Sequence, residues 1–170
     1  MQSYGPRIQI RPTEERDLGF LRELWNDARV MRECGYPDGM QISEEGVRQW
    51  WIMTPQAQQL DRRYHPLAPD VSIIALLDGT PIGECVTAFD AQNRARFNIR
   101  LAAEYWGKGY ATEAVTLALR EIFATTPVER VIVEPSPTNP AAVHLFENQG
   151  FHQAATPNHP HRWECTREDF

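Results

Sequence analysis

The sequence is poor in cysteine and has no long apolar run, which excludes several classes of protein. Its three cysteines, Cys34, Cys85 and Cys165, are odd in number and show no Cys-x-x-Cys spacing, so a disulfide scaffold and a cysteine-ligated metal site are disfavoured. The longest apolar stretches, such as residues 71–77, are far too short to span a bilayer. The first residues contain no apolar core of a signal peptide. We therefore expect a cytoplasmic protein with no metal site and no membrane partner.

Basic residues are also scarce relative to acidic ones. The chain has 17 Lys and Arg against 23 Asp and Glu, a formal net charge of −6. This balance argues against nucleic acid as a partner and leaves room for a cationic substrate. A length of 170 residues with 42% hydrophobic and 24% charged residues is ordinary for one soluble domain. Since no repeat, low-complexity block or linker interrupts the chain, we expect a single domain over residues 1–170.

The first third of the chain predicts one strand and two helices. Residues 7–11 alternate and end at Pro12, which predicts a strand, and Thr13 before an acidic run predicts the N-cap of a helix. A break rich in Gly and Pro at residues 35–39 separates this helix from a second one that begins at Ser43. The apolar residues of the two helices include Leu18, Phe20, Leu21, Leu24, Trp25, Trp50, Trp51 and Ile52.

The middle of the chain predicts an antiparallel meander. Residues 71–77 and 82–89 flank an Asp-Gly turn, which is the strongest short-range signal for a β-hairpin. Residues 96–101 supply a third strand after a turn at Asn93. Directly after this strand comes a run with two glycines, Gly107 and Gly109, and then a long amphipathic helix.

The two glycines predict an anion-binding loop. Without Cβ atoms, Gly107 and Gly109 let the backbone approach a ligand closely. The first turn of the following helix adds free N–H groups and the positive end of the helix dipole. Such an arrangement suits a phosphate or a pyrophosphate, although many turns with two glycines only reverse the chain.

The last third predicts a strand, a short helix and a hairpin. Residues 128–133 form the strand, Thr138 or Asn139 caps a helix over residues 140–148, and Gly150 ends it. The complete order is β-α-α-β-β-β, glycine loop, α-β-α-β-β. A doubly wound dinucleotide-binding fold would place Gly-x-Gly-x-x-Gly after its first strand. Here the glycines follow three meander strands and the third glycine is missing, so that fold is excluded.

Three blocks of sequence resemble the GCN5-related N-acetyltransferases (GNAT), and among them the ribosomal-protein-alanine and aminoglycoside-type enzymes. The blocks run over residues 8–27, 97–114 and 134–151. The third is the most specific, because an acid at a strand end, the Asn139 cap and a helix closing in Gly-Phe rarely coincide at this distance. The resemblance covers nearly the whole chain. It implies an α/β (α+β) fold with a mixed, mostly antiparallel sheet of about seven strands, flanked by about four helices.

The resemblance implies acetyl-CoA as cosubstrate and assigns residues to it. The strand before the loop is similar to the family strand that pairs with pantetheine, and the loop to the one that holds the pyrophosphate. Asn139 resembles a residue that contacts the cofactor, although a helix cap explains it equally well. The backbone positions concerned are Ile99, Arg100 and Leu101 for pantetheine, and Gly107, Lys108, Gly109, Tyr110, Ala111 and Thr112 for the pyrophosphate.

Acetyl transfer to an amine needs a group that takes a proton from the amine. Glu134, at the end of a predicted strand, resembles the acid that serves as base in such enzymes, and it is our first candidate for a catalytic residue. A solvated charge at a sheet edge is the alternative explanation. Glu84 on the second meander strand is the reserve candidate. Many relatives place a Glu on the third meander strand, but here that region reads Ala95-Arg96-Phe97.

The proton donor for the leaving thiolate departs from the family pattern. Relatives commonly carry a Tyr that faces the sulfur, and Phe146 occupies that place beside the cofactor. Since a phenyl ring cannot donate a proton, water or the substrate ammonium, or a hydroxyl such as Tyr105 or Ser136, would replace it, or transfer is slow or lost. Trp106 stands where relatives usually have Arg or Gln. His144 points away from Phe146 and is expected at the surface or near the adenine.

The sequence does not identify the acceptor. The family builds its acceptor site from the first two helices and the terminal hairpin, which here contribute Trp25, Tyr36, Trp50, Trp51 and residues 159–163. Residues 62–65 predict either a solvated loop, which we favour, or a lid. The function implied is transfer of acetyl directly onto a primary amine: a protein N-terminus, or a small cation such as an aminoglycoside or a polyamine. The alternative is a catalytically weak acyl-CoA-binding sensor or scaffold module. A homodimer is compatible with the family.

Overall fold

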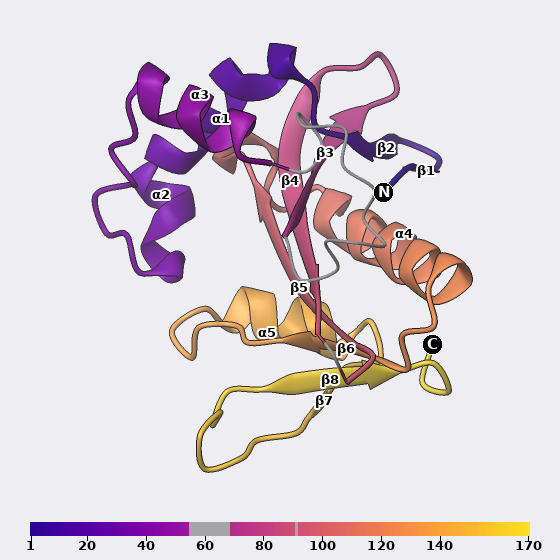
Figure 1. The fold of residues 1–170 in the computed structure, drawn as a ribbon. Coiled ribbons are helices and arrows are strands. Elements are labelled where there is room, and N and C mark those ends of the chain that lie inside the picture. Colours follow the sequence, from indigo (N-terminus) through magenta and orange to yellow (C-terminus); the bar gives the residue numbers. More distant parts are fainter. Residues whose placement is uncertain (55–68, 91) are drawn as a thin grey trace.

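A computed structural model describes residues 1–54, 69–90 and 92–170, and within them it confirms the α/β architecture (Figure 1). The segment 62–65, interpreted above as a loop or a lid, lies outside the described residues. The described strands form one eight-stranded sheet in the order β1-β2-β3-β4-β5-β6-β8-β7. All neighbours pair antiparallel except β5 and β6, which are parallel. The sheet is therefore mixed and mostly antiparallel, as the resemblance implies.

The strands and helices have the following bounds. The strands are β1 (Ser3–Tyr4), β2 (Ile8–Pro12), β3 (Asp70–Leu76), β4 (Pro81–Phe89), β5 (Arg94–Leu101), β6 (Arg130–Val133), β7 (His152–Gln153) and β8 (Trp163–Thr166). The helices are α1 (Leu18–Asn26), α2 (Ala28–Met31), α3 (Glu44–Ile52), α4 (Tyr110–Thr125) and α5 (Pro140–Glu147). Within the described residues, the eight strands and five α-helices exceed the expected seven and four, because the sequence pattern did not reveal the two-residue strand β1 and the four-residue helix α2.

The predicted N-cap at Thr13 is wrong. The Thr13 hydroxyl donates to the carbonyl of Val71 at 2.6 Å, so this side chain ties β2 to β3 instead of starting a helix. Glu14 caps a 3₁₀ turn over Glu15–Asp17, and the Asp17 carboxylate accepts from the Glu14 N–H at 2.9 Å. Helix α1 follows this turn. The N-cap at Ser43 is confirmed, since its hydroxyl accepts from the N–H of Gly46 at 3.0 Å.

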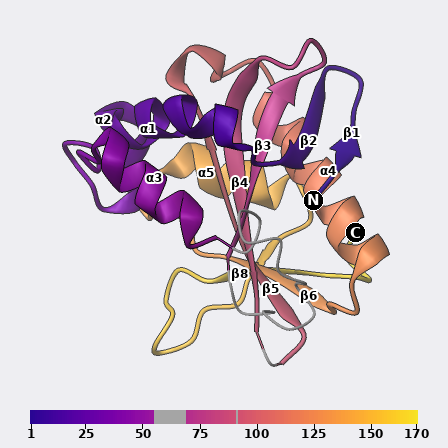
Figure 2. The same cartoon turned by 45° about the horizontal axis from the view of Figure 1, so that its top comes forward.

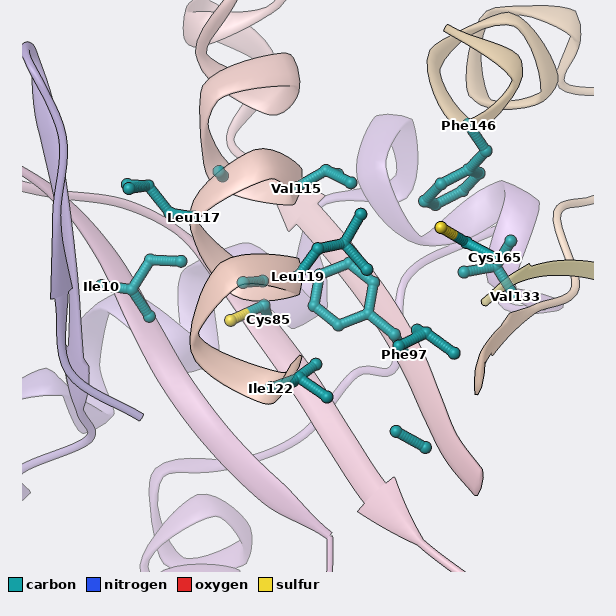
Figure 3. Packing of buried hydrophobic residues seen from close by; sticks show 14 of the residues in the cluster. Ile10, Cys85, Phe97, Val115, Leu117, Leu119, Ile122, Val133, Phe146 and Cys165 are labelled. Atoms are coloured by element: carbon teal, nitrogen blue, oxygen red, sulfur yellow. The ribbon is translucent and has the colours of Figure 1, made fainter. Parts of the chain in front are cut away.

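Helices cover both faces of the sheet, as Figures 1 and 2 show, and each face has its own apolar core. Helices α1–α3 pack on one face with a cluster that includes Leu21, Trp25 and Ile73. Helices α4 and α5 pack on the other face, where Leu119 and Phe146 belong to a larger cluster (Figure 3).

Residues of β5 alternate between these two cores. Ala95, Phe97 and Leu101 are buried in the cluster under α4. Because successive side chains of a strand point to opposite faces, Arg96, Asn98 and Arg100 lie on the face that α1–α3 cover. The sequence thus directs two arginines of this strand toward one face of the sheet.

Candidate functional site

The sheet opens between β5 and β6. The two strands pair only over Arg94–Arg96 of β5, and the rest of β5 has no partner strand on that side among the described residues. The N–H of Ala102 donates to Ile82 on β4, at 2.9 Å. Because peptide groups along a strand alternate in direction, those of Ile99 and Leu101 point the other way, toward the opening. An extended chain can pair with these groups.

The glycine loop lies at the end of the same strand. A 3₁₀ turn over Ala103–Tyr105 leads into it, and Gly107 and Gly109 adopt left-handed backbone angles, φ +69° and +80°. Gly109 is the N-cap residue of α4 and no side chain caps this helix end. The N–H groups of residues 110–112 thus have no intrahelical partner. A Cβ on Gly107 would meet nothing within 4 Å, so the backbone there is open to a ligand.

Arg7 and Glu113 hold this loop in place. The Arg7 guanidinium donates from Nη1 to the carbonyl of Lys108 at 2.9 Å and from Nε to Glu113 at 2.8 Å. The backbone N–H groups of Arg7 and Ile8 donate to the other Glu113 oxygen. Burial raises the pKa of Glu113. The hydrogen bonds from the Arg7 donors together have a larger effect in the other direction, so the pKa of Glu113 lies below its ordinary value. Sequence reasoning missed this clamp, which joins residues 106 positions apart.

The Trp106 side chain donates a hydrogen bond to β5, the strand that precedes it. Its indole Nε1 donates to the carbonyl of Leu101 at 2.8 Å, while 49% of the side chain stays exposed. One of the predicted pantetheine-facing carbonyls therefore already has a donor, and the N–H of Leu101 and both peptide groups of Ile99 are left for an extended ligand. The ammonium of Lys108, the only lysine of the chain, lies 5.6 Å from the ring centroid of Tyr105.

Asn139 caps α5, and the residue before it contacts Glu33. The Asn139 amide oxygen accepts from the N–H of Ala142 at 3.0 Å, which resolves the two alternatives for this cap. Thr138 instead donates to the carboxylate of Glu33 at 2.6 Å, and the two hydroxyls of Thr138 and Ser136 lie 2.7 Å apart. These hydrogen bonds lower the pKa of Glu33.

Phe146 lies in the core beside the opening. Its side chain is 5% exposed, packs edge-on against Phe151 at 5.2 Å, and lies with Cys165 and Val133 in Figure 3. The ring therefore offers little surface to a cofactor in this structure, and its role in cofactor binding stays a prediction. The His144 side chain is 76% exposed, in agreement with the expected surface position.

Glu134 follows β6 directly and faces three basic side chains. One carboxylate oxygen lies 2.8 Å from His159 Nδ1 and 3.5 Å from Arg162 Nε, and the other lies 3.8 Å from Arg96 Nη1. The side chain is 34% exposed, so a ligand in the opening can reach it. Sequence reasoning named Glu134 and placed residues 159–163 near the acceptor, but it did not anticipate that these arginines and the histidine share one carboxylate.

The Glu84 side chain is buried on the face of the sheet that α1–α3 cover. Its side chain is 0% exposed, and one oxygen accepts from Trp25 Nε1 at 2.8 Å and from Arg100 Nη1. The second oxygen has no hydrogen-bond partner among the described residues. Burial raises the pKa of Glu84, against the opposing effects of Arg100 and Trp25. Of the two candidate bases, Glu134 is partly exposed and Glu84 is fully buried, and a catalytic role for either stays a prediction.

The tryptophans of the first helices pack on one another. The rings of Trp25 and Trp50 meet edge to face at 4.8 Å, and those of Trp50 and Trp51 lie 6.4 Å apart. Trp25 is buried, whereas Tyr36 is 45% exposed. The three tryptophans thus form one cluster between α1 and α3, and Tyr36 is the most exposed of the four aromatic residues named for the acceptor site.

No cluster of three or more His, Cys, Asp or Glu side chains among the described residues has the arrangement that a metal ion needs. None of the described helices is long and apolar enough to cross a membrane.

Comparison with known proteins gives consistent results. The sequence profile of the acetyltransferase (GNAT) domain matches residues 7–152. The spermidine N(1)-acetyltransferase of Escherichia coli K12 is 28% identical over 151 residues, 85% of this chain and 72% of that protein. The aminoglycoside N(6')-acetyltransferase type 1 of Klebsiella pneumoniae is 24% identical over 166 residues, 90% and 78% of the two chains. The spermidine N-acetyltransferase of Vibrio cholerae, solved with CoA and spermine, superposes with a TM-score of 0.79 at 20% identity, covering 97% of this chain and 98% of that one.

Proposed function

The chain belongs to the GNAT acetyltransferase family and is an acetyl-CoA-dependent N-acetyltransferase, and from this premise we propose that its acceptor is a primary amine held at Glu134. The observation that carries the proposal is one opening in the sheet. The free edge of β5 and the glycine loop line it on one side, and Glu134 stands at the end of β6 on the other.

The residues present fit acetyl-CoA. The N–H groups at the start of α4 and the open backbone at Gly107 suit the pyrophosphate, because they offer unpaired donors and the positive end of a helix dipole. The N–H of Leu101 and the peptide groups of Ile99 would pair with pantetheine. Arg100 shares the strand, but its peptide group faces β4, so its part in pantetheine binding is the weakest of the three. Asn139 sits at the start of α5 as a cap and would contact the cofactor only with atoms that the cap leaves free.

Glu134 would take the proton that the amine must lose. Acetyl-CoA supplies a thioester, whose C–S bond breaks as the amine nitrogen bonds to the carbonyl carbon. An ammonium has no lone pair for this attack, so a carboxylate that removes its proton, directly or through one water, makes the nitrogen reactive. Phe146 has no proton to give, and water or the substrate ammonium protonates the departing thiolate.

The relatives indicate the size and chemistry of the acceptor. Two of them are named for spermidine and for aminoglycosides, which are small polyamines and amino sugars. We propose either such a small amine or a protein N-terminus for this chain. A second candidate function is a weakly catalytic sensor or scaffold that binds acyl-CoA, and the phenyl ring at Phe146 is the observation that favours it.

Release of CoA thiol in the presence of different amines tests the proposal. The panel contains a polyamine, an aminoglycoside, a lysine-type amine and a peptide with a free N-terminus. We expect at least one amine to raise thiol release well above hydrolysis of acetyl-CoA alone. If acetyl-CoA binds and none of the amines accelerates release, the sensor or scaffold replaces the enzyme as the better interpretation.

The loop makes a prediction about cofactor affinity. Alanine at Gly109 must adopt a left-handed conformation, at a cost of about 1–2 kcal/mol. Its Cβ also comes within 3.3 Å of Arg7 Nη2 and displaces the side chain that holds the loop. We expect Gly109→Ala to raise the Kd for acetyl-CoA by about tenfold, measured by calorimetry.

Gly79→Ala is the matched control for this variant. Gly79 has a similar angle, φ +93°, with no atom within 4 Å of an added Cβ, and it lies in the turn between β3 and β4. It should lose stability like Gly109→Ala but keep its affinity for acetyl-CoA. Equal affinities of the two variants would show that the loop does not bind the cofactor.

The proposal also covers the cellular location and the oligomeric state of the protein. A cytoplasmic location suits the thiols of Cys34, Cys85 and Cys165, all three free in the structure, because cytosolic thiols stay reduced. Burial raises the pKa of Cys165 to about 11, so this thiol is unreactive. A single catalytic domain over residues 1–170 and a homodimer stay predictions.

A further inference from the structure

The basic side chains around Glu134 outnumber the acid they face. Arg96 comes from β5, and His159 and Arg162 come from the connection between β7 and β8. This connection is held by its own backbone hydrogen bonds, from Ala154 to Arg162 at 3.0 Å and from Thr156 to His159 at 3.1 Å. Even with the histidine neutral, two guanidinium groups share one carboxylate. The charge beside the predicted acceptor site is therefore in excess by one cation.

The two arginines are not saturated by Glu134. Their ion-pair distances, 3.8 Å for Arg96 and 3.5 Å for Arg162, exceed the 2.7–2.9 Å typical of a charged hydrogen bond. Neither guanidinium makes a hydrogen bond to any residue that the structure describes, and Arg162 Nε is buried without a partner. The Arg162 side chain is only 9% exposed. A buried guanidinium without a hydrogen-bond acceptor is costly even when a carboxylate lies nearby, so we expect a further acceptor for Arg162.

Several other arginines of the chain are saturated. Arg11 makes two hydrogen bonds to Asp17, at 2.7 and 2.8 Å, and Arg29 makes three to the Asp27 carboxylate. Arg7 is bonded to Glu113 and to a carbonyl. These three arginines have close partners, whereas Arg96 and Arg162 keep open donors beside Glu134, where an acceptor would lie.

We propose that the acceptor amine of this enzyme carries an oxyanion, a carboxylate or a phosphate, which Arg96 and Arg162 bind. The proposal rests on the proposed function and defines its substrate class. The ammonium of the acceptor lies against Glu134 and the oxyanion against the two guanidiniums. The Glu134 oxygens lie 3.5 Å from Arg162 Nε and 3.8 Å from Arg96 Nη1, which suits a molecule whose amine and anion are close together. Guanidinium groups match the planar, two-oxygen geometry of these anions.

Matched pairs of amines test the proposal. Each pair shares its carbon skeleton and differs only in the anion: tyrosine and tyramine, ornithine and putrescine, and an amino sugar with and without a phosphate ester. The measurement is kcat/KM for release of CoA thiol. We expect the anionic member of at least one pair to be preferred about tenfold or more. Comparison of the two pairs that differ in a carboxylate with the pair that differs in a phosphate shows which oxyanion the site binds.

Variants assign the preference to the two arginines. Arg96→Glu should reverse the preference within the best pair, because the new carboxylate repels the oxyanion of the anionic member. Arg162→Lys retains a charge but loses the forked donors and should reduce the preference mainly through KM. Arg120→Glu makes the same charge change at an exposed position near the end of α4 and should leave the preference intact. Circular dichroism and acetyl-CoA binding establish that each variant is folded.

The outcomes separate this proposal from the one it rests on. If no amine of either kind releases thiol, the proposed function fails and the substrate class fails with it. If amines are acetylated but the members without the anion equal or exceed their anionic partners, the enzyme stands and the oxyanion is overturned. An anionic preference that persists in both Arg96→Glu and Arg162→Lys also overturns the assignment to these residues.

Discussion

Glutamine in place of Glu134 is expected to lower kcat with the best amine by about a hundredfold or more, the usual contribution of a positioned base. The amide keeps the size of the side chain but cannot take a proton. Because Glu134 stands at the end of β6 and the glycine loop follows β5, the Kd for acetyl-CoA should stay nearly constant. Steady-state kinetics and calorimetry measure the two quantities separately.

Glu129→Gln provides the control for the loss of one negative charge. Glu129 is exposed and precedes β6, whereas Glu134 follows it. The control variant should keep the wild-type kcat. A wild-type rate for Glu134→Gln would remove Glu134 from the mechanism. A loss that is confined to KM would make it a group that holds the ammonium and not a base.

Leucine in place of Glu84 is expected to lower the free energy of unfolding by about 3–5 kcal/mol, the cost of breaking a buried ion pair on one side. Arg100, only 18% exposed, would lose its carboxylate, and the indole N–H of Trp25 would lose its acceptor. Urea denaturation monitored by tryptophan fluorescence measures the change. This is the largest effect on stability that we expect from one substitution.

Two further variants show that the ion pair is the cause. Glu84→Gln retains an acceptor for the Trp25 indole and should lose less than Glu84→Leu. The double variant Glu84→Met/Arg100→Met replaces the pair by apolar side chains and should recover most of the loss, since buried pairs contribute little net stability over well-packed apolar residues. If Glu84→Leu costs less than about 1 kcal/mol, the pair is hydrated and the argument from burial is wrong.

Local sequence signals were sufficient for the elements that define the opening. The Asp-Gly turn predicted the hairpin of β3 and β4, and the two glycines predicted the loop before α4. The cap of α5 was narrowed to Thr138 or Asn139 and its end was predicted at Gly150, because each depends on residues a few positions apart. These are the features that a short window of sequence determines.

Contacts between distant segments could not be predicted in this way. The Thr13 hydroxyl has two possible partners, a nearby helix N–H or a distant carbonyl, and the pairing of β2 with β3 decides for the carbonyl. Likewise, the strand alternation that turns Glu84 toward Trp25 buries a carboxylate that the pattern left as a candidate base. The cations around Glu134 come together only because the β7–β8 hairpin returns to the end of β6.

The clamp between Arg7 and Glu113 ties the glycine loop to the start of β2. Since Glu113 accepts backbone donors at the start of β2 and Arg7 donates to the Lys108 carbonyl, docking of this strand and ordering of the loop are coupled. The loop loses conformational entropy when the chain folds. The binding free energy of a ligand therefore does not include this cost. Coupling of this kind is reciprocal: a ligand that stabilises the loop must stabilise the N-terminal strand by the same free energy.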